Sequence, residues 1–489
     1  MALAVVMLVD RGRERTIDGG QDLGQRDLTR WTGEHVPAAD PPLRADQPCP
    51  LRGKEDLLQI RLGERGALGD LFDRGRPIQT VQREREQRPA RVITPGGHFH
   101  RDHGRTLGAK GQTESTGSRY PQRVEPPAPV RPVYDGPGLS NVVPALLGAR
   151  DVPWLPEPTR AARTVVVLVI DGLGWEAITG RPELLPEVSK LTGGPITTVA
   201  PSTTASALTS ITTGRPPAEH GVIGFRILVD QIVLNVLSWQ ASNGRRPPEP
   251  FTVQRHPPFF GREVDVVTKA EFASTGFTEA HLRGTRFHGW KAVSSLVEEC
   301  RLLAAAGTPF VYAYYDGVDA VAHAHGLHDG FYDAELRFAD RLVGNLLDAL
   351  PEEAALVVVS DHGQVHVGPD GWRDLDGVAD LFERGSGDGR FRYLHAKRGA
   401  APDLLTTATA LYGAEAWVLG RDELLEGGWL GPAPSPATRR RVGDVVVAAR
   451  GPVAFTDPAL PREAGLISAH GSLTEAEMLV PLVAGRGRA

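Results

Sequence analysis

The sequence predicts an α/β fold in which a mostly parallel central sheet is flanked by helices, with a small α/β subdomain inserted into the chain. Three apolar runs, at 164–170, 310–315 and 355–360, indicate buried strands because they are rich in β-branched or aromatic residues. Helical stretches separate the runs, and this alternation is typical of parallel sheets. Each run ends at or next to an acidic residue, which places several carboxylates at one edge of the sheet.

The first 125 residues differ from the rest of the chain. They are dense in Arg, Gly, Gln and Asp and have almost no sustained hydrophobic period, so we expect a low-complexity, poorly ordered N-terminal extension. A proline-rich connector at 126–132 predicts the start of one functional domain, which runs from 126 to 489. Within it, strand-like runs between about 366 and 455 interrupt the series of motifs and predict the inserted subdomain.

The composition excludes several classes of partner. A net charge of -6 creates no overall field that favours nucleic acid or an anionic membrane. No stretch approaches the roughly 20 apolar residues of a membrane span, and the apolar opening 1–9 lacks the cationic start and the cleavage site of a signal peptide. Cys49 and Cys300 are far apart and outside any CxxC motif, which argues against a disulfide framework or a thiolate zinc site. We expect a cytoplasmic protein with no nucleic-acid or membrane partner.

Asp171 follows the first apolar run. Gly172 after it permits a sharp turn of the backbone, which leaves the carboxylate facing the edge of the sheet. Ligands of open α/β sheets bind beyond the carboxyl ends of the strands, so Asp171 is a candidate ligand. Taken alone, an Asp-Gly pair after a strand is an ordinary turn in most proteins.

The segment 200–214 is rich in small and hydroxylated residues. At the start of a helix such residues expose a side-chain oxygen beside unpaired backbone N–H groups, which suits a phosphate and predicts a nucleophilic threonine. The segment by itself leaves both Thr203 and Thr204 open as the nucleophile. It also leaves open that either threonine is only an N-cap.

Asp319 and His323 are four residues apart. On a helical turn this spacing puts a carboxylate and an imidazole on one face, as a Zn²⁺ site requires. His325 competes as a ligand at another spacing, and Asp316 and His328 are further polar neighbours. The alternative for so many polar residues is a solvated loop.

Asp361 and His362 stand at the end of a fully apolar strand, where neither side chain has a packing rationale. Both therefore need a charged partner, and metal ligation is the better interpretation. Near the C-terminus, His470 precedes Gly471 at a turn and would supply one more imidazole, although a single histidine there is otherwise an ordinary loop residue.

The order of these motifs resembles the alkaline phosphatase superfamily and, within it, the nucleotide pyrophosphatase/phosphodiesterase branch, over roughly residues 160 to 485. The resemblance implies a first metal position built by Asp171, Thr204, Asp361 and His362. It implies a second metal position built by Asp319, His323 and His470. It also favours Thr204 over Thr203, because the family nucleophile lies nine residues before the Thr of a Thr-Gly pair, which here is Thr213.

The resemblance implies a phosphoric ester hydrolase that acts on a small phosphorylated substrate. Two divalent ions, most readily Zn²⁺ with Mn²⁺ or Mg²⁺ as alternatives, would activate Thr204 for attack on phosphorus. A phospho-threonine intermediate would follow, and the substrates would be nucleotide-type phosphodiesters or pyrophosphates. Alternatives are a phosphomonoesterase or phosphonate hydrolase of the same superfamily, and a catalytically silent module that binds metal and phosphate.

Two features depart from this pattern. Animal members of the branch carry an asparagine that grips a phosphate oxygen shortly after a His-Gly pair, whereas this chain has Phe225 there. Phe225, Arg226 and Asn235 are therefore candidate substrate-binding positions, and the preference for diesters or monoesters stays open. Separately, 98–103 reproduces the H-x-H-x-D-H motif of metallo-β-lactamase-like hydrolases, but no adequate apolar strand precedes it.

Overall fold

The computed structural model describes residues 128–148 and 150–489. The predicted N-terminal extension and the histidine motif at 98–103 lie outside the described residues. Among the helices of the described part, none is long and apolar enough to cross a membrane.

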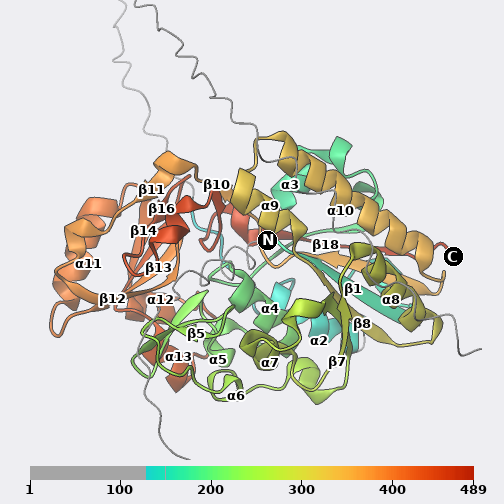
Figure 1. Ribbon diagram of the computed structural model, residues 1–489, viewed down its shortest axis with the longest axis horizontal. Coiled ribbons are helices and arrows are strands. Elements are labelled where there is room, and N and C mark those ends of the chain that lie inside the picture. The colour runs from blue at the N-terminus through green and yellow to red at the C-terminus, as the bar shows by residue number, and fades with distance from the viewer. Residues whose placement is uncertain (1–127, 149) are drawn as a thin grey trace, which may run out of the picture. The chain divides into compact units, whose positions relative to one another are not determined.

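A seven-stranded central sheet organises the molecule, in the order β2-β18-β9-β1-β8-β6-β7 (Figure 1). Its strands are β1 (Thr164–Ile170), β2 (Thr192–Thr197), β6 (Asp265–Lys269), β7 (Arg286–Trp290), β8 (Phe310–Tyr315), β9 (Ala354–Val359) and β18 (Leu479–Arg486). The neighbours from β9 to β7 are parallel, while β18 runs antiparallel to both β9 and β2. The prediction of a mostly parallel sheet is confirmed.

The three predicted apolar runs form the centre of this sheet. β1 lies between β9 and β8, and its seven residues are all buried, as expected for a parallel strand covered on both faces. Because the three strands are parallel neighbours, their carboxyl ends meet at one edge. That edge carries the residues that follow each strand, namely Asp171, Asp316 and Asp361.

Helices cover both faces of the sheet, and alternate residues of β1 face the two layers. Val165, Val167 and Val169 pack with α2 (Val142–Leu147), α4 (Thr204–Thr213) and α7 (Gly276–Leu282). Val166, Leu168 and Ile170 pack with α3 (Trp175–Gly180), α8 (Val293–Ala305) and α10 (Gly330–Ala349). Figure 1 shows α3 and α10 above the sheet and α4 and α7 below it.

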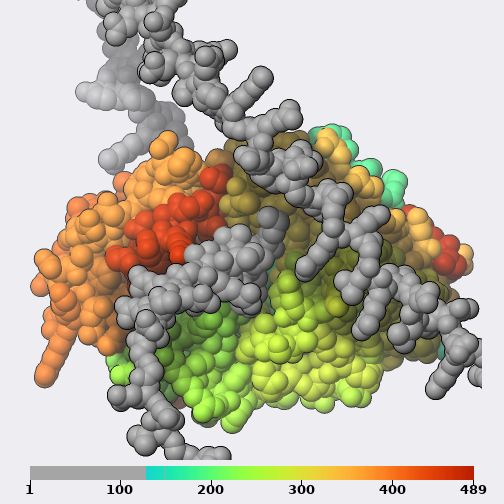
Figure 2. All heavy atoms as spheres, in the orientation of Figure 1, coloured from blue at the N-terminus to red at the C-terminus, as the bar shows by residue number. Residues whose placement is uncertain are grey.

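A separate four-stranded antiparallel sheet lies within the stretch for which an inserted subdomain is predicted. Its order is β12 (Phe382–Asp388), β13 (Phe391–Ala396), β15 (Val445–Ala449) and β14 (Ala416–Gly420). The helices of this stretch are α11 (Ala401–Tyr412), α12 (Arg421–Glu426) and α13 (Pro436–Arg441). In Figure 2 its orange atoms lie beside the red atoms of the C-terminal part. The boundaries of the subdomain stay a prediction.

Short elements join these layers. A three-stranded sheet is formed by β3 (Arg226–Val229), β4 (Ile232–Asn235) and β5 (Gln240–Ala241). Two-stranded pairs are β10 (Val365–His366) with β17 (Ser468–Ala469), and β11 (Trp372–Arg373) with β16 (Ala454–Phe455). The remaining α-helices are α5 (Pro217–His220), α6 (Pro250–Val253), α9 (Gly317–His325) and α14 (Glu475–Met478).

Candidate active site

The seven residues predicted to ligate metal come together at the carboxyl edge of the central sheet. Asp171 follows β1, and Asp361 and His362 lie just beyond β9. Asp319 and His323 are on α9, which begins two residues after β8 ends. Thr204 is the first residue of α4, and His470 follows β17. Gly172 makes the turn after β1 with φ 75°, and a Cβ there would lie 3.0 Å from the Cα of Asp319.

One group of side chains surrounds the Nε2 atom of His362. This atom is 3.0 Å from the Thr204 Oγ1, 3.3 Å from Asp171 Oδ1 and 3.4 Å from Asp361 Oδ2. His362 and Asp361 are fully buried, and Asp171 and Thr204 nearly so. The hydroxyl of Thr204 therefore lies among two carboxylates and an imidazole.

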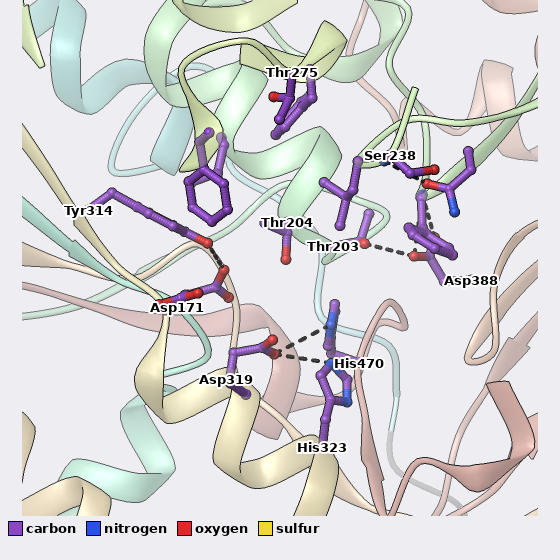
Figure 3. A pocket seen from close by; sticks show the side chains of 18 of the residues that line it. Asp171, Thr203, Thr204, Ser238, Thr275, Tyr314, Asp319, His323, Asp388 and His470 are labelled. Carbon is purple, nitrogen blue, oxygen red and sulfur yellow. Dashed lines mark hydrogen bonds and ion pairs between the residues drawn. The ribbon is translucent and has the colours of Figure 1, made fainter. Parts of the chain in front are cut away.

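A second group is centred on Asp319. Its Oδ1 is 3.2 Å from His323 Nε2 and 3.7 Å from His470 Nε2 (Figure 3). The rings of His470 and His362 stack with centroids 3.5 Å apart, so the two groups are adjacent. The structure thus contains two overlapping sets of potential ligands, Asp319 with His323 and His470, and Asp171 with Asp319 and His362, each with ligand atoms within 4.8 Å of one another.

All three histidines present the same ring nitrogen to the site. Their Nδ1 atoms lie against the backbone carbonyl oxygens of Ser468 for His323 (2.7 Å), Gly363 for His362 (3.0 Å) and Ser202 for His470 (3.1 Å). A carbonyl oxygen only accepts, so Nδ1 carries the proton and donates it. Each Nε2 then offers a lone pair to the site, which is the arrangement of a metal-binding histidine.

The carboxylates lack donors on the side that faces these nitrogens. Asp171 Oδ1 and Asp361 Oδ2 are buried and have no hydrogen-bond partner within the described part of the chain. Together with the lone pair of His362 Nε2, which can accept from the Thr204 hydroxyl at 3.0 Å, they group three acceptors around one place. Buried acceptors of this kind need a cation, so the donor set fits a divalent metal ion.

The pKa values of the three aspartates reflect their burial and the charges around them. Burial raises the pKa of Asp171 well above its usual range, and the charges of Asp361 and Asp319 raise it further. Burial also raises the pKa of Asp361. Burial would raise the pKa of Asp319 as well, but the imidazole of His323, with those of His470 and His362, outweighs it and lowers the pKa. A divalent cation would remove the repulsion among the carboxylates.

Three neighbours donate hydrogen bonds to these carboxylates. The hydroxyl of Tyr314 donates to Asp171 Oδ2, and the amide of Gln364 donates to Asp319 Oδ1 at 2.6 Å. The N–H of Gly172 donates to Asp361 Oδ1 at 3.1 Å. The sequence did not reveal Tyr314, which lies inside an apolar run, whereas the position of Gln364 two residues after His362 was an available signal.

The two candidate nucleophiles point in different directions. In Figure 3 the hydroxyl of Thr204 faces the space between Asp171 and His470, while that of Thr203 is turned towards Asp388. Thr203 Oγ1 donates to Asp388 Oδ1 at 2.7 Å. Burial raises the pKa of Asp388 to about 7. Asp388 ends β12 of the separate sheet, in a stretch where the sequence shows no motif.

A cavity of about 220 Å³ opens beside these groups. Away from Thr204 and Asp319 its wall is largely apolar, with contributions from Phe225, Leu237, Phe272, Phe277, Leu282 and Trp372. Of the described residues that line it, none is Lys or Arg. The cavity therefore joins a cluster of metal-ligand groups to a largely apolar compartment whose described lining residues carry no basic side chain.

The predicted substrate-binding residues separate into two kinds. Phe225 and Asn235 line the cavity, and Asn235 Oδ1 accepts from the N–H of Ser238 at 3.1 Å. Arg226 is buried in an ion pair with Asp457 and does not line the cavity. The side chain of Arg226 is therefore engaged elsewhere in this structure.

The other polar residues near α9 stand apart from the two ligand groups. Asp316 lines the cavity and is paired with Lys269 at 2.6 Å. The ring of His325 stacks on Phe331, with centroids 4.0 Å apart, and the ring of His328 lies 4.5 Å from that of His366.

The fold and this side-chain cluster define a class of protein, the metal-dependent hydrolases of phosphoric esters. The family profile described as type I phosphodiesterase/nucleotide pyrophosphatase matches residues 165–473, more than half of the chain. The chain belongs to this family, which is part of the alkaline phosphatase superfamily. Its members are metal-dependent phosphoric ester hydrolases.

Two forms of one mammalian protein share the fold at low sequence identity, and a further structure is matched with a lower TM-score. An inactive form of murine ectonucleotide pyrophosphatase/phosphodiesterase 5 in complex with AMP is 15% identical, covers 66% of this chain and 87% of its own, and has a TM-score of 0.50. The human protein of the same name is 13% identical over 67% and 88% of the two chains, with a TM-score of 0.51. Phosphonoacetate hydrolase from Sinorhizobium meliloti is 18% identical over 67% and 91%, with a TM-score of 0.48. A search of curated proteins found no match.

Proposed function

We propose that this enzyme hydrolyses phosphodiesters at two divalent metal ions through a phospho-threonine intermediate on Thr204. The observation that carries the proposal is the convergence of the Thr204 hydroxyl with the unpartnered oxygens of Asp171 and Asp361. A hydroxyl in such a place has no purely structural role, because it lies among acceptors that need a cation.

The residues divide into two metal positions. Asp171, Asp361, His362 and Thr204 would hold the first ion, and Asp319, His323 and His470 the second. The mixture of imidazole nitrogen and carboxylate oxygen favours Zn²⁺, while the oxygen-rich first position also suits Mn²⁺ or Mg²⁺. Bound ions would promote ionisation of the Thr204 hydroxyl and neutralise the phosphoryl oxygens.

The chain's own contribution is to place the nucleophile. Thr204 begins α4, so the first N–H groups of this helix have no intrahelical acceptor and can donate to a phosphoryl oxygen. Thr204 Oγ1 forms a bond to phosphorus while the bond to the leaving oxygen breaks. Water then attacks phosphorus, the bond to Oγ1 breaks, and the threonine is restored. Thr203 is the weaker candidate, because its hydroxyl is bonded to Asp388.

The residues that line the cavity favour phosphodiester substrates whose leaving group is uncharged and apolar or aromatic. A diester carries one negative charge, whereas a monoester or a pyrophosphate brings more. With no Lys or Arg among the described lining residues, only the metal ions and backbone N–H groups would balance that charge. Phe272 and Phe277 offer apolar faces to a nucleobase or another aromatic group.

The variant Thr204→Ala tests the proposal. Loss of the nucleophile should reduce hydrolysis of a chromogenic aryl phosphodiester by roughly 10³-fold or more, while Thr204→Ser retains measurable turnover. Metal content and thermal unfolding, measured for both variants, control for the integrity of the site. Acid quenching of the active enzyme during turnover should trap a phosphoryl group on the chain. Full activity of Thr204→Ala would contradict the proposal.

A further inference from the structure

Thr203 occupies the N-cap position of α4 but does not cap the helix. Its backbone is extended, with φ -134° and ψ 145°, the conformation in which a threonine side chain ordinarily accepts a hydrogen bond from the second or third N–H of the helix. No such bond is formed by its side chain. The hydroxyl donates to Asp388 Oδ1 at 2.7 Å instead, and so it is directed away from the helix.

Asp388 reaches Thr203 from the separate four-stranded sheet. It is 5% exposed, and the N–H of Phe225 lies 3.3 Å from both of its oxygens. Two glycines leave room for it: an added Cβ at Gly224 would lie 3.1 Å from Asp388 Oδ2, and one at Gly471 would lie 3.0 Å from Asp388 Cβ. The carboxylate is therefore confined to one orientation beside the site.

Structural stabilisation alone does not account for this carboxylate. In residues 128–148 and 150–489 no basic group pairs with Asp388 within 4.0 Å. The nearby Arg392 is bonded to Glu463 at 2.7 Å. A buried carboxylate that has only a hydroxyl and a backbone N–H as donors costs stability relative to an apolar residue of similar size.

We infer that Asp388 is a positioning residue of the active site, which holds the Thr203 hydroxyl away from the N-terminus of α4. The first N–H groups of the helix then stay open for the phosphoryl oxygens of the substrate, beside Thr204. The inference rests on the proposed function, because that function places the phosphoryl group at this helix start. Without Asp388, the Thr203 hydroxyl would turn to the N–H of Ala205 or Ser206 and compete with the substrate.

Three variants of the full chain, loaded with metal, test the inference. In Asp388→Ala the freed Thr203 hydroxyl should occupy one N–H group at the start of the helix. KM and the inhibition constant of inorganic phosphate should therefore rise by roughly five- to tenfold, the free energy of one helix cap, while kcat changes less. The double variant Asp388→Ala/Thr203→Val has no hydroxyl to compete, so phosphate inhibition should return towards that of the wild type. Thr203→Val alone serves as the matched control.

Recovery of phosphate inhibition in the double variant distinguishes a positioning role of Asp388 from a purely structural role. If Asp388 only supported the fold, the double variant would bind phosphate no better than Asp388→Ala, and that result would overturn the inference. So would an unchanged phosphate inhibition constant in Asp388→Ala.

Asp388→Asn gives a second test should the alanine variant not fold. Its amide oxygen still accepts from Thr203, so phosphate affinity should stay within about twofold of the wild type. A loss of tenfold or more would overturn the inference. Direct titration of phosphate into metal-loaded Thr204→Ala, with and without Asp388→Ala, needs no turnover. It therefore distinguishes failure of the positioning role from failure of the proposed reaction.

Discussion

Two regions of this molecule bury charged side chains in opposite ways. At the edge of the central sheet, Asp171 and Asp361 each bury a carboxylate oxygen that has no hydrogen-bond partner within the described part of the chain, and no Lys or Arg there pairs with either residue. In and around the four-stranded sheet two buried arginines are paired with carboxylates: Arg390 with Glu477 at 2.7 Å, and Arg392 with Glu463 at 2.7 Å. The first arrangement favours a bound cation, whereas in the second the chain supplies the opposite charges itself. We therefore expect changes at the edge of the central sheet to affect activity and changes in the four-stranded sheet to affect stability.

Removal of one strand-end carboxylate should have the largest effect on activity. Asp361→Asn removes a predicted metal ligand and should lower kcat/KM by roughly 10³-fold. The same change relieves repulsion between Asp361 and Asp171, so in the presence of a chelator the variant should unfold at a higher temperature than the wild type.

Thermal unfolding and activity, each measured with and without chelator, check both effects. A chelator should lower the thermal midpoint and abolish the activity of the wild type, because it removes a ligand that binds the folded state. It should change the variant much less. A metal-free Asp361→Asn that is less stable than the metal-free wild type would show that the strand-end carboxylates do not repel one another.

Breaking a pair in the second region should act on stability. Arg390 and Glu477 are both fully buried and joined by two hydrogen bonds, of 2.7 and 2.8 Å. Arg390→Met leaves the carboxylate of Glu477 without its partner and should lower the free energy of unfolding by about 3–5 kcal/mol. In chemical denaturation, Arg390→Met/Glu477→Gln should be less destabilised than the sum of the two single variants. Additive losses would mean that the two side chains do not act as a pair.

The same contrast explains what the sequence alone could predict. The three central strands could be predicted because both of their faces are buried, which produces unbroken apolar runs. Because the strands are parallel, the residues that follow them meet at one edge of the sheet for any conformation of the loops. The spacing of Asp319 and His323 was readable because it is local to one helix. The contact between Thr203 and Asp388 joins residues 185 positions apart, at the start of α4 and the end of β12. No local pattern marks such a contact.

Asp388 stands between the two regions: it belongs to the four-stranded sheet, but among the described residues no basic side chain pairs with it. Its titration should change only the pH dependence of stability. Burial raises its pKa to about 7, well above the value of about 3.9 for an exposed Asp in an unfolded chain. Below pH 4 the group is protonated in both states and costs nothing. Between pH 4 and 7 the unfolded chain releases this proton while the folded protein keeps it, so the contribution of Asp388 to stability falls as the pH rises and is constant above about pH 7. Asp388→Asn does not titrate and should gain on the order of 4 kcal/mol relative to the wild type over this window, measured by denaturant unfolding at fixed metal concentration. If the difference in the free energy of unfolding between Asp388→Asn and the wild type did not change with pH, a cation would lie near Asp388. Asp388 would then belong with the paired charges of the second region.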